Sequence, residues 1–252
     1  MHPRPYTIPL TENLSVAVKG LTTEQRDTNL YRIMDFAKVV QIFERKELYF
    51  ANPTVWDDPW EARLKHHKND SLFAQCWGEL GVSDAMWRIY SQNGMGVRIS
   101  TTASRLRKAL KAATSTTNLR FRLEPVTYLP QKSINSEAKK IKASLDDEFD
   151  IRRAVDMLYY KRDAFEHEHE WRATIFISDA EKTNGKLGVT VPIDPHSLIK
   201  NILLDPRAPK ELVNAFQYYF KSKLEFKGDV KPSVLYKVPS LLEVNSIRAE
   251  DL

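Results

Sequence analysis

Glycine is scarce in this chain, which has only eight glycines among 252 residues. Loops that cradle phosphate need glycine where backbone amides close tightly on an anion. The closest pair, Gly94 and Gly96, has no third glycine in register for a dinucleotide fingerprint, and Gly185 lies outside any P-loop pattern. The sequence therefore argues against a Rossmann or P-loop nucleotide site.

Cysteine and long apolar runs are lacking as well. The single cysteine, Cys76, excludes an internal disulfide and is typical of a reducing cytoplasm, where we expect the protein. No apolar run approaches the roughly 18 residues that cross a bilayer. Prolines at positions 3, 5 and 9 interrupt the first ten residues, so we expect neither a secretory signal nor membrane attachment.

Charge and apolar content are ordinary. The 38 Lys and Arg against 33 Asp and Glu leave a net charge of +5, which favours a nucleic-acid or phosphate-bearing partner only slightly. The 42% of apolar residues is typical of a soluble globular protein, and a chain of this length buries a core without disulfides or a structural metal.

Periodicity predicts a mixed α/β (α+β) fold. We expect one α/β domain over residues 29–240, between an N-terminal arm (1–28) and a C-terminal tail (241–252), because no repeat or linker interrupts the pattern. Alternating apolar residues predict strands at 30–34, 48–51, 71–77, 97–100, 121–129, 171–177, 187–191, 199–204 and 234–238. Spacings of three and four predict helices after Asp35, from Ser83, after 101–104, over 136–162 and from Pro209.

A further helix start is predicted in the run Trp56-Asp57-Asp58-Pro59-Trp60-Glu61. Asp58 would be the N-cap, Pro59 the first helical residue, and Glu61 would reach back to a free amide.

The most unusual segment alternates carboxylates and imidazoles immediately before an apolar strand: Glu166-His167-Glu168-His169-Glu170. In an extended chain the three glutamates share one face and raise one another's pKa, which indicates a functional role. The alternative is a solvated loop whose glutamates pair with Arg162, Arg172 or nearby lysines.

Other chemistries are less well supported. His167 and His169 form a His-x-His pair, but no third metal ligand follows at a telling spacing, so we expect no metal site. Cys76 lies among Leu72, Phe73 and Trp77 and is best interpreted as a small buried residue. Asp57, Asp58, Glu168 and Glu170 together would supply the carboxylates of a metal-dependent nuclease.

Arg32 stands out on the first strand, because an arginine among apolar residues must reach solvent, pair with a carboxylate or bind an anion. If it faces a pocket, its planar guanidinium suits a diphosphate.

The ordered motifs resemble a bacterial family known as domain of unknown function 2971. The resemblance covers about residues 30–206 and rests on residues 30–32, 48–53, 56–61, 76–77, 86–90, 96–99, Lys161 with 166–172, and 199–206. Trp56-Asp57-Asp58-Pro59 departs from the expected Asn-Asp-Pro core.

A more distant resemblance is to ADP-ribosyltransferases, which implies a split sheet flanked by helices, with NAD as substrate. It makes Glu170 the carboxylate that stabilises the ribosyl cation and Glu168 the residue that orients the acceptor or takes its proton. Arg32 would bind the NAD diphosphate, Ser100 or Thr101 would support the ribose or the carboxylate, and the stacking candidates for nicotinamide are Tyr31, Tyr90 and Trp87.

The leading hypothesis is therefore ADP-ribosyl transfer or NAD hydrolysis by a bacterial toxin or defence effector, with a nucleic acid or a protein as acceptor. The alternatives are a non-catalytic nucleic-acid-binding or partner-sensing module, and the metal-dependent nuclease.

Overall fold

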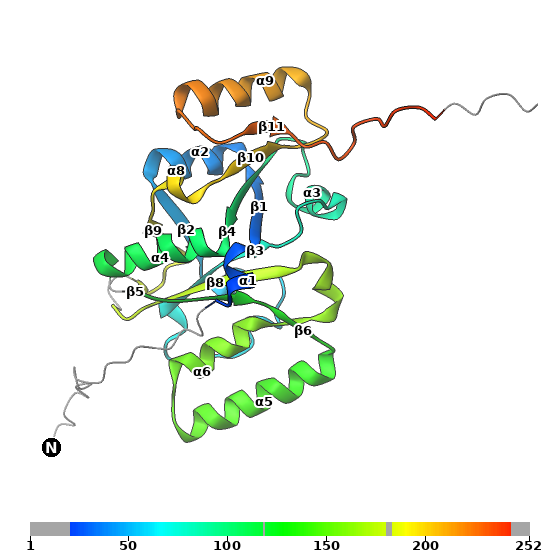
Figure 1. The fold of residues 1–252 in the computed structure, drawn as a ribbon. Coiled ribbons are helices and arrows are strands. Elements are labelled where there is room, and N and C mark those ends of the chain that lie inside the picture. The colour runs from blue at the N-terminus through cyan, green and yellow to red at the C-terminus, as the bar shows by residue number, and fades with distance from the viewer. Residues whose placement is uncertain (1–20, 118, 180–182, 243–252) are drawn as a thin grey trace, which may run out of the picture. The chain divides into compact units, whose positions relative to one another are not determined.

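The computed structural model describes residues 21–117, 119–179 and 183–242 (Figure 1). Its backbone divides into two compact units that interleave along the sequence. Among the described residues, the first unit comprises 21–30, Leu48–Glu79, 102–117, 119–179 and 183–193, and the second comprises Tyr31–Glu47, Leu80–Thr101 and 194–242. Because the segments interleave, the division does not separate successive domains, and the expected single domain stays a prediction.

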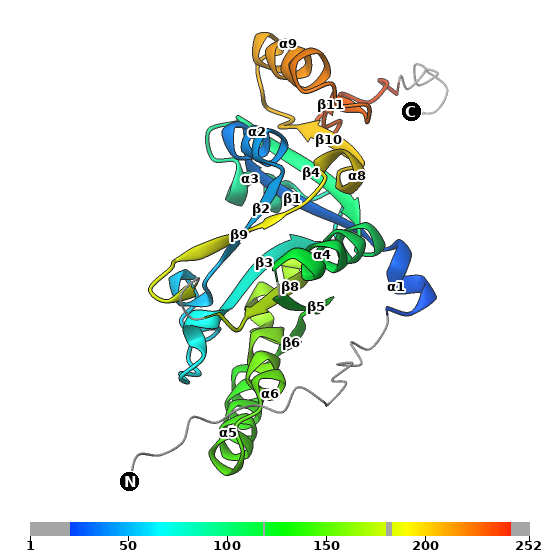
Figure 2. The same cartoon turned by 90° about the vertical axis from the view of Figure 1, so that its left-hand side faces the viewer.

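The first unit is a sheet between helices. Its strands lie in the order β5-β8-β3-β2-β9, and β8 pairs antiparallel with both β3 and β5. Figures 1 and 2 show α4 on one face of β5 and β8, with α5 and α6 on the other. The elements are α1 (Thr23–Asp27), β2 (Glu47–Ala51), β3 (Leu72–Gly78), α4 (Ala103–Thr117), β5 (Leu119–Pro125), β6 (Thr127–Leu129), α5 (Gln131–Asp147), α6 (Ile151–Asp156), β7 (Tyr160–Arg162), β8 (Glu170–Ile177) and β9 (Gly188–Pro192).

Part of the hydrophobic core of this unit lies between the sheet and the helices α5 and α6. Leu72 of β3 packs against Val155, Leu158 and Tyr159, which follow one another through α6 and the 3₁₀ turn η3 (Met157–Tyr159). The central strand β8 is buried at seven of its eight residues, although Glu170, Arg172 and Thr174 alternate with apolar residues in its first half. Any polar side chain on β8 must therefore find its partners inside the protein.

The second unit holds strands in the order β11-β10-β4-β1. Helix α2 buries Val39, Ile42 and Phe43, and Phe36 at its start stacks on Phe216 of α9 with 3.9 Å between ring centroids. The elements are β1 (Asn29–Asp35), α2 (Phe36–Arg45), α3 (Asp84–Tyr90), β4 (Gly96–Thr102), α8 (Pro195–Leu198), β10 (Asn201–Leu204), α9 (Lys210–Tyr218), the π-helical turn η5 (Tyr219–Lys223) and β11 (Val230–Pro232).

The mixed α/β class and most predicted elements are confirmed, while three predictions are wrong. Residues 59–62 form a turn and not a helix. The helix predicted over 136–162 ends at Asp147, resumes at Ile151 and gives way to β7. Residues 234–238 form no strand, and β11 ends at Pro232. Within the described ranges, no helix is both long enough and apolar enough to cross a membrane.

Candidate functional site

The segment before β8 is coiled and not extended, so the predicted alternation of its side chains is wrong. Asp163–Glu168 form the 3₁₀ helix η4, and His169 follows in the left-handed region with φ 41°. The amide of His169 donates to the carbonyl of Glu166, which closes the turn. Glu166 and His167 are consequently exposed, whereas Glu168 is half-buried and Glu170 is buried.

Glu170 begins β8 and is bound by two cations. Arg172 lies two residues further along, on the same face of the strand, and donates from Nε to Oε1 at 2.7 Å and from Nη2 to Oε2 at 2.8 Å. Lys161 Nζ donates to Oε2 at 3.0 Å. This two-pronged ion pair occupies both oxygens of Glu170, whose side chain is 3% exposed.

Glu61, in the turn at 59–62, contacts the same two cations, Arg172 and Lys161. Its Oε2 accepts from Arg172 Nη2 at 3.0 Å, and its Oε1 lies 3.2 Å from Lys161 Nζ. The predicted capping role is therefore wrong, because the carboxylate points to buried cations. Asp58 keeps part of its predicted role, since its Oδ1 accepts from the amide of Trp60, but it also pairs with Arg162 at 3.1 Å.

Lys161 is the centre of the arrangement. Its Nζ also donates to Oε2 of Glu168 at 2.7 Å, so one ammonium contacts three carboxylates. We call the five residues Glu61, Lys161, Glu168, Glu170 and Arg172 the charge cluster. With every group ionised, three carboxylates face two cations, which leaves one negative charge in excess.

The electrostatics differ from the sequence expectation that the glutamates raise one another's pKa. Burial acts in that direction on Glu170, but the Arg172 guanidinium and Lys161 outweigh it and hold the pKa of Glu170 at about 2. For Glu61, burial dominates over the same two cations, and its pKa is raised. Burial also raises the pKa of the Cys76 thiol, with Glu170 next to it, so Cys76 remains protonated, but the residue is half-buried and the predicted fully buried role holds only in part.

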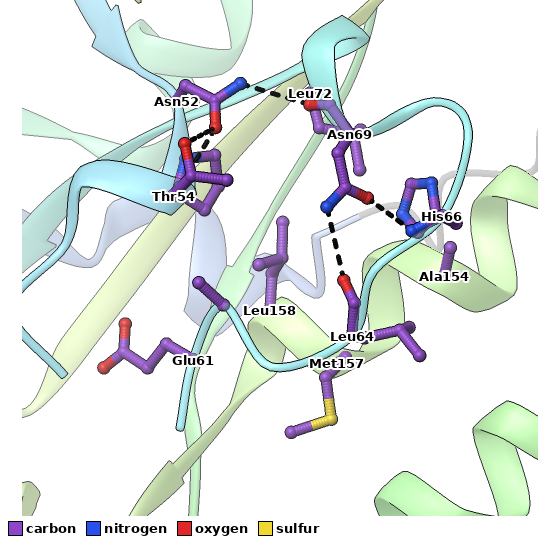
Figure 3. Close-up of a pocket in the computed structure, with 12 residues that line it drawn as sticks. Asn52, Thr54, Glu61, Leu64, His66, Asn69, Leu72, Ala154, Met157 and Leu158 are labelled. Atoms are coloured by element: carbon purple, nitrogen blue, oxygen red, sulfur yellow. Dashed lines mark hydrogen bonds between the residues drawn. The ribbon is translucent and has the colours of Figure 1, made fainter. Parts of the chain in front are cut away.

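A pocket adjoins the charge cluster on the side of Glu61 (Figure 3). It encloses about 360 Å³, counting the space at its open mouth, and is lined mainly by aliphatic residues including Leu64, Met157 and Leu158. Burial, followed by the neighbouring His67, lowers the pKa of His66 in its wall to about 4. The pocket is therefore a largely uncharged surface that ends at one carboxylate.

The remaining predicted site residues all belong to the second unit. The hydroxyl of Thr101 donates to the carbonyl of Leu198 at 2.7 Å, and that of Ser100 donates to the carbonyl of Asn201 at 3.2 Å. Tyr31 lies against the Arg98 guanidinium at 4.5 Å from the ring centroid, Arg32 is half-buried in β1, and Tyr90 is 44% exposed. Their predicted contacts with NAD stay predictions.

The nuclease hypothesis gains no support from these contacts. Glu168 and Glu170 already have ammonium and guanidinium partners, and Asp58 is paired with Arg162. Among the residues that the structure describes, no three His, Cys, Asp or Glu side chains are placed to hold a metal ion.

The sequence predicted no role for Lys161, and it favoured a helix cap for Glu61 over a divalent-ion group with Asp57 and Asp58. Lys161 and Glu61 both lie in motifs of the family resemblance, and that was the one signal that pointed to both of them. Two aromatic residues were also missed. Tyr128 accepts the backbone N–H of Glu170 at 2.7 Å, and Trp56 lies beneath Arg172 at 4.4 Å from the ring centroid.

The buried hydroxyl of Tyr159 contacts β8 at Arg172 and Thr174, and its removal is a first test of the structure around the charge cluster. Its Oη lies 3.1 Å from the Arg172 carbonyl and 3.0 Å from the Thr174 hydroxyl, in the protein interior. We expect Tyr159→Phe to lower the free energy of unfolding by about 1–3 kcal/mol in urea titrations, because these polar groups lose a buried partner. Tyr49→Phe is the control, since its hydroxyl is at the surface. Equal losses in both variants would contradict the structural role.

Comparisons with known proteins agree with part of the sequence analysis. Residues 86–173 match the model of a family described as "Protein of unknown function (DUF2971)". This confirms the family resemblance over a segment that contains four of the five charge-cluster residues. No curated protein matches the chain.

Two solved structures of DarT from Thermus sp. 2.9 are similar in fold. The complex with NAD+ is 12% identical, with 82% of this chain and 96% of that chain covered and a TM-score of 0.39. The complex with ADP-ribosylated ssDNA is also 12% identical, with 82% and 94% covered and a TM-score of 0.39. These values are too low to place any residue of the present chain.

Proposed function

We propose that this protein cleaves the nicotinamide–ribose bond of NAD and transfers the ADP-ribosyl group to an acceptor or to water. The observation that carries the proposal is the excess negative charge of the charge cluster, which reaches the surface at Glu168. When the C1′–N bond breaks, nicotinamide leaves with the bonding electrons and positive charge develops on the ribose. A fixed carboxylate beside that ribose stabilises the transition state more than the ground state.

Glu168 is better suited to contact the ribose than Glu170. Both oxygens of Glu170 are bound to cations, and its side chain is 3% exposed. Glu168 uses only Oε2 for its one ion pair within the described part of the chain, and its side chain is 13% exposed. We therefore propose the reverse of the sequence-based assignment, with Glu168 at the ribose and Glu170 as its buried support.

The roles predicted for residues of the second unit remain separate hypotheses. Arg32 is proposed to bind the diphosphate, Ser100 or Thr101 to support the ribose, and Tyr31 or Tyr90 to stack on nicotinamide. Arg32→Ala tests the first of these by raising the KM for NAD.

A nucleic acid is the acceptor that the surface favours. Helix α4 exposes Lys108 and Lys111 and contains no acidic residue. By contrast, α5 neutralises Lys140 with Glu137 and Lys142 with Asp146. Among the described residues, no carboxylate forms an ion pair with Lys108 or Lys111, and exposed lysines of this kind favour phosphodiesters. The same face would serve the alternative function, a nucleic-acid-binding module without catalysis. A toxin or defence role in the bacterial cytoplasm remains part of the proposal.

Nicotinamide release from NAD by the purified protein tests the proposed function. We expect release to exceed the rate without protein and to rise when total bacterial RNA or single-stranded DNA is added. NAD should also raise the melting temperature, because a ligand that binds only the folded state stabilises it. Protein that releases no nicotinamide and shows no NAD-dependent shift would overturn the proposal. Salt-sensitive nucleic-acid binding by such protein would favour the binding module instead.

A further inference from the structure

Lys161 holds a position that the proposed chemistry does not by itself explain. Its ammonium lies 2.7 Å from Glu168, 3.0 Å from Glu170 and 3.2 Å from Glu61, and its side chain is only 9% exposed. The ammonium donates to Glu168 and Glu170 and forms an ion pair with Glu61. A buried lysine held by three carboxylates is fixed in both position and charge.

The second cation of the cluster does not duplicate this contact. Arg172 donates to Glu170 and Glu61, and its remaining nitrogen Nη1 donates to the carbonyl of Leu158. Among the described residues, Lys161 is the sole cation paired with Glu168. Without it, Glu168 would face the carboxylates of Glu61 and Glu170 with no positive charge between them.

We infer that Lys161 is the positioning residue that holds the Glu168 carboxylate in place and favours its ionised form. This inference deepens the proposed function, on which its kinetic test rests. We assign Lys161 no part in bond making, because its ammonium is already held among the three carboxylates of the charge cluster. It acts through Glu168, whose ionised form alone can stabilise a cationic ribose.

Protonation of Glu168 depends on all the charges around it. On its own helix η4, Glu166 and His167 point to solvent. The titratable and charged groups on the elements around it include Glu61, Cys76, Tyr128, Lys161, Glu170 and Arg172, and also Arg162 of β7, whose guanidinium lies 5.2 Å from the Phe165 ring of η4. Burial opposes the charge of Lys161, but Glu170 and Glu61 raise its pKa above its ordinary value, so it is a cation at any physiological pH. Removing that charge leaves the Glu168 carboxylate beside Glu61 and Glu170 without its cation, which disfavours its ionised form.

The kinetic test compares Lys161→Met with Lys161→Arg over pH 5–9. We expect the acid limb of nicotinamide release to move up by about one pH unit or more in Lys161→Met, and activity to recover at high pH. Lys161→Arg keeps the charge and should keep the wild-type limb. Lys140→Met is the matched control, because that lysine is exposed and pairs with Glu137 on α5. Loss of activity by the same factor at every pH, with an unmoved limb, would overturn the inference.

A direct titration separates this inference from the proposed function. Carbon-13 NMR of the glutamate carboxyls, assigned with Glu168→Gln, measures the midpoint of Glu168 whether or not NAD is cleaved. The expected midpoint is about one pH unit or more higher in Lys161→Met, and in Lys161→Gln if the methionine variant does not fold. Equal midpoints would overturn the inference, whereas inactivity of the wild type would overturn only the proposed function.

Discussion

Arg172→Met is expected to lower the free energy of unfolding by about 3–5 kcal/mol, because it removes one partner of a buried ion pair and leaves the others uncompensated. Arg172 has no exposed side-chain surface and donates to Glu170 and Glu61. In the variant, three carboxylates share the single charge of Lys161 in a water-poor interior. Urea unfolding at pH 7 measures the loss.

The matched control is Arg152→Met, whose guanidinium pairs with Asp150 at 2.9 Å but is 56% exposed. Surface pairs of this kind contribute at most about 1 kcal/mol. The double variant Arg172→Met/Glu170→Leu should regain part of the lost stability, because it also removes the carboxylate left without its main partner. A single variant as stable as the control would show that the charge cluster is not buried as described.

The stability lost in Arg172→Met should decrease as the pH falls. The folded-state pKa of Glu170 is about 2, below its ordinary 4.5, so the ion pair stabilises the fold above pH 4.5 and stops doing so as pH falls toward 2. This lowering of the Glu170 pKa from 4.5 to about 2 corresponds to about 3 kcal/mol of folding stability at neutral pH. Arg172→Met keeps Lys161 but lacks the larger part of this contribution, so its deficit relative to the wild type should be largest at neutral pH and smaller at pH 3. A deficit that grows on acidification would contradict this account.

Strand β8 shows which features of the fold and the site can be predicted from the sequence. Its apolar alternation from Trp171 predicts the strand correctly, because burial of the strand selects those residues directly. The sequence analysis also offered, as the alternative to a functional face, pairing of the glutamates with Arg172. That pairing is present, but it is buried and not solvated.

Glu61 shows why the rest could not be predicted. A glutamate after Asp-Pro-Trp is fully explained by its local sequence as a helix-capping residue. The local pattern therefore does not indicate any other role for Glu61. Its actual partner, Arg172, is 111 residues away in the sequence. A contact that only the tertiary fold creates leaves no local signature. The sequence also could not distinguish the exposed Glu166 from the buried Glu170. The left-handed turn at His169 breaks the alternation of side chains that an extended chain would have.

Glu168→Gln and Glu170→Gln should separate the two carboxylates by different readouts. If Glu168 contacts the ribose, Glu168→Gln removes a charge that acts mainly in the transition state, and we expect nicotinamide release to fall about 10²–10³-fold. Its free energy of unfolding should change by about 1 kcal/mol, because the side chain makes a single described ion pair and the glutamine amide oxygen can still accept from Lys161. Glu170→Gln should instead lose about 2–3 kcal/mol of stability, because both of its oxygens serve buried cations.

Glu166→Gln is the control for both variants, since this exposed neighbour lies two residues before Glu168 and should change neither readout. Activity is compared at a temperature where each variant remains folded, so that loss of structure is not counted as loss of catalysis. A Glu168→Gln variant with the wild-type rate, beside a folded but inactive Glu170→Gln, would return the ribose contact to Glu170. That outcome would require Glu170 to exchange a cation for the substrate, and a substrate-dependent rise in its pKa would be the evidence of that exchange.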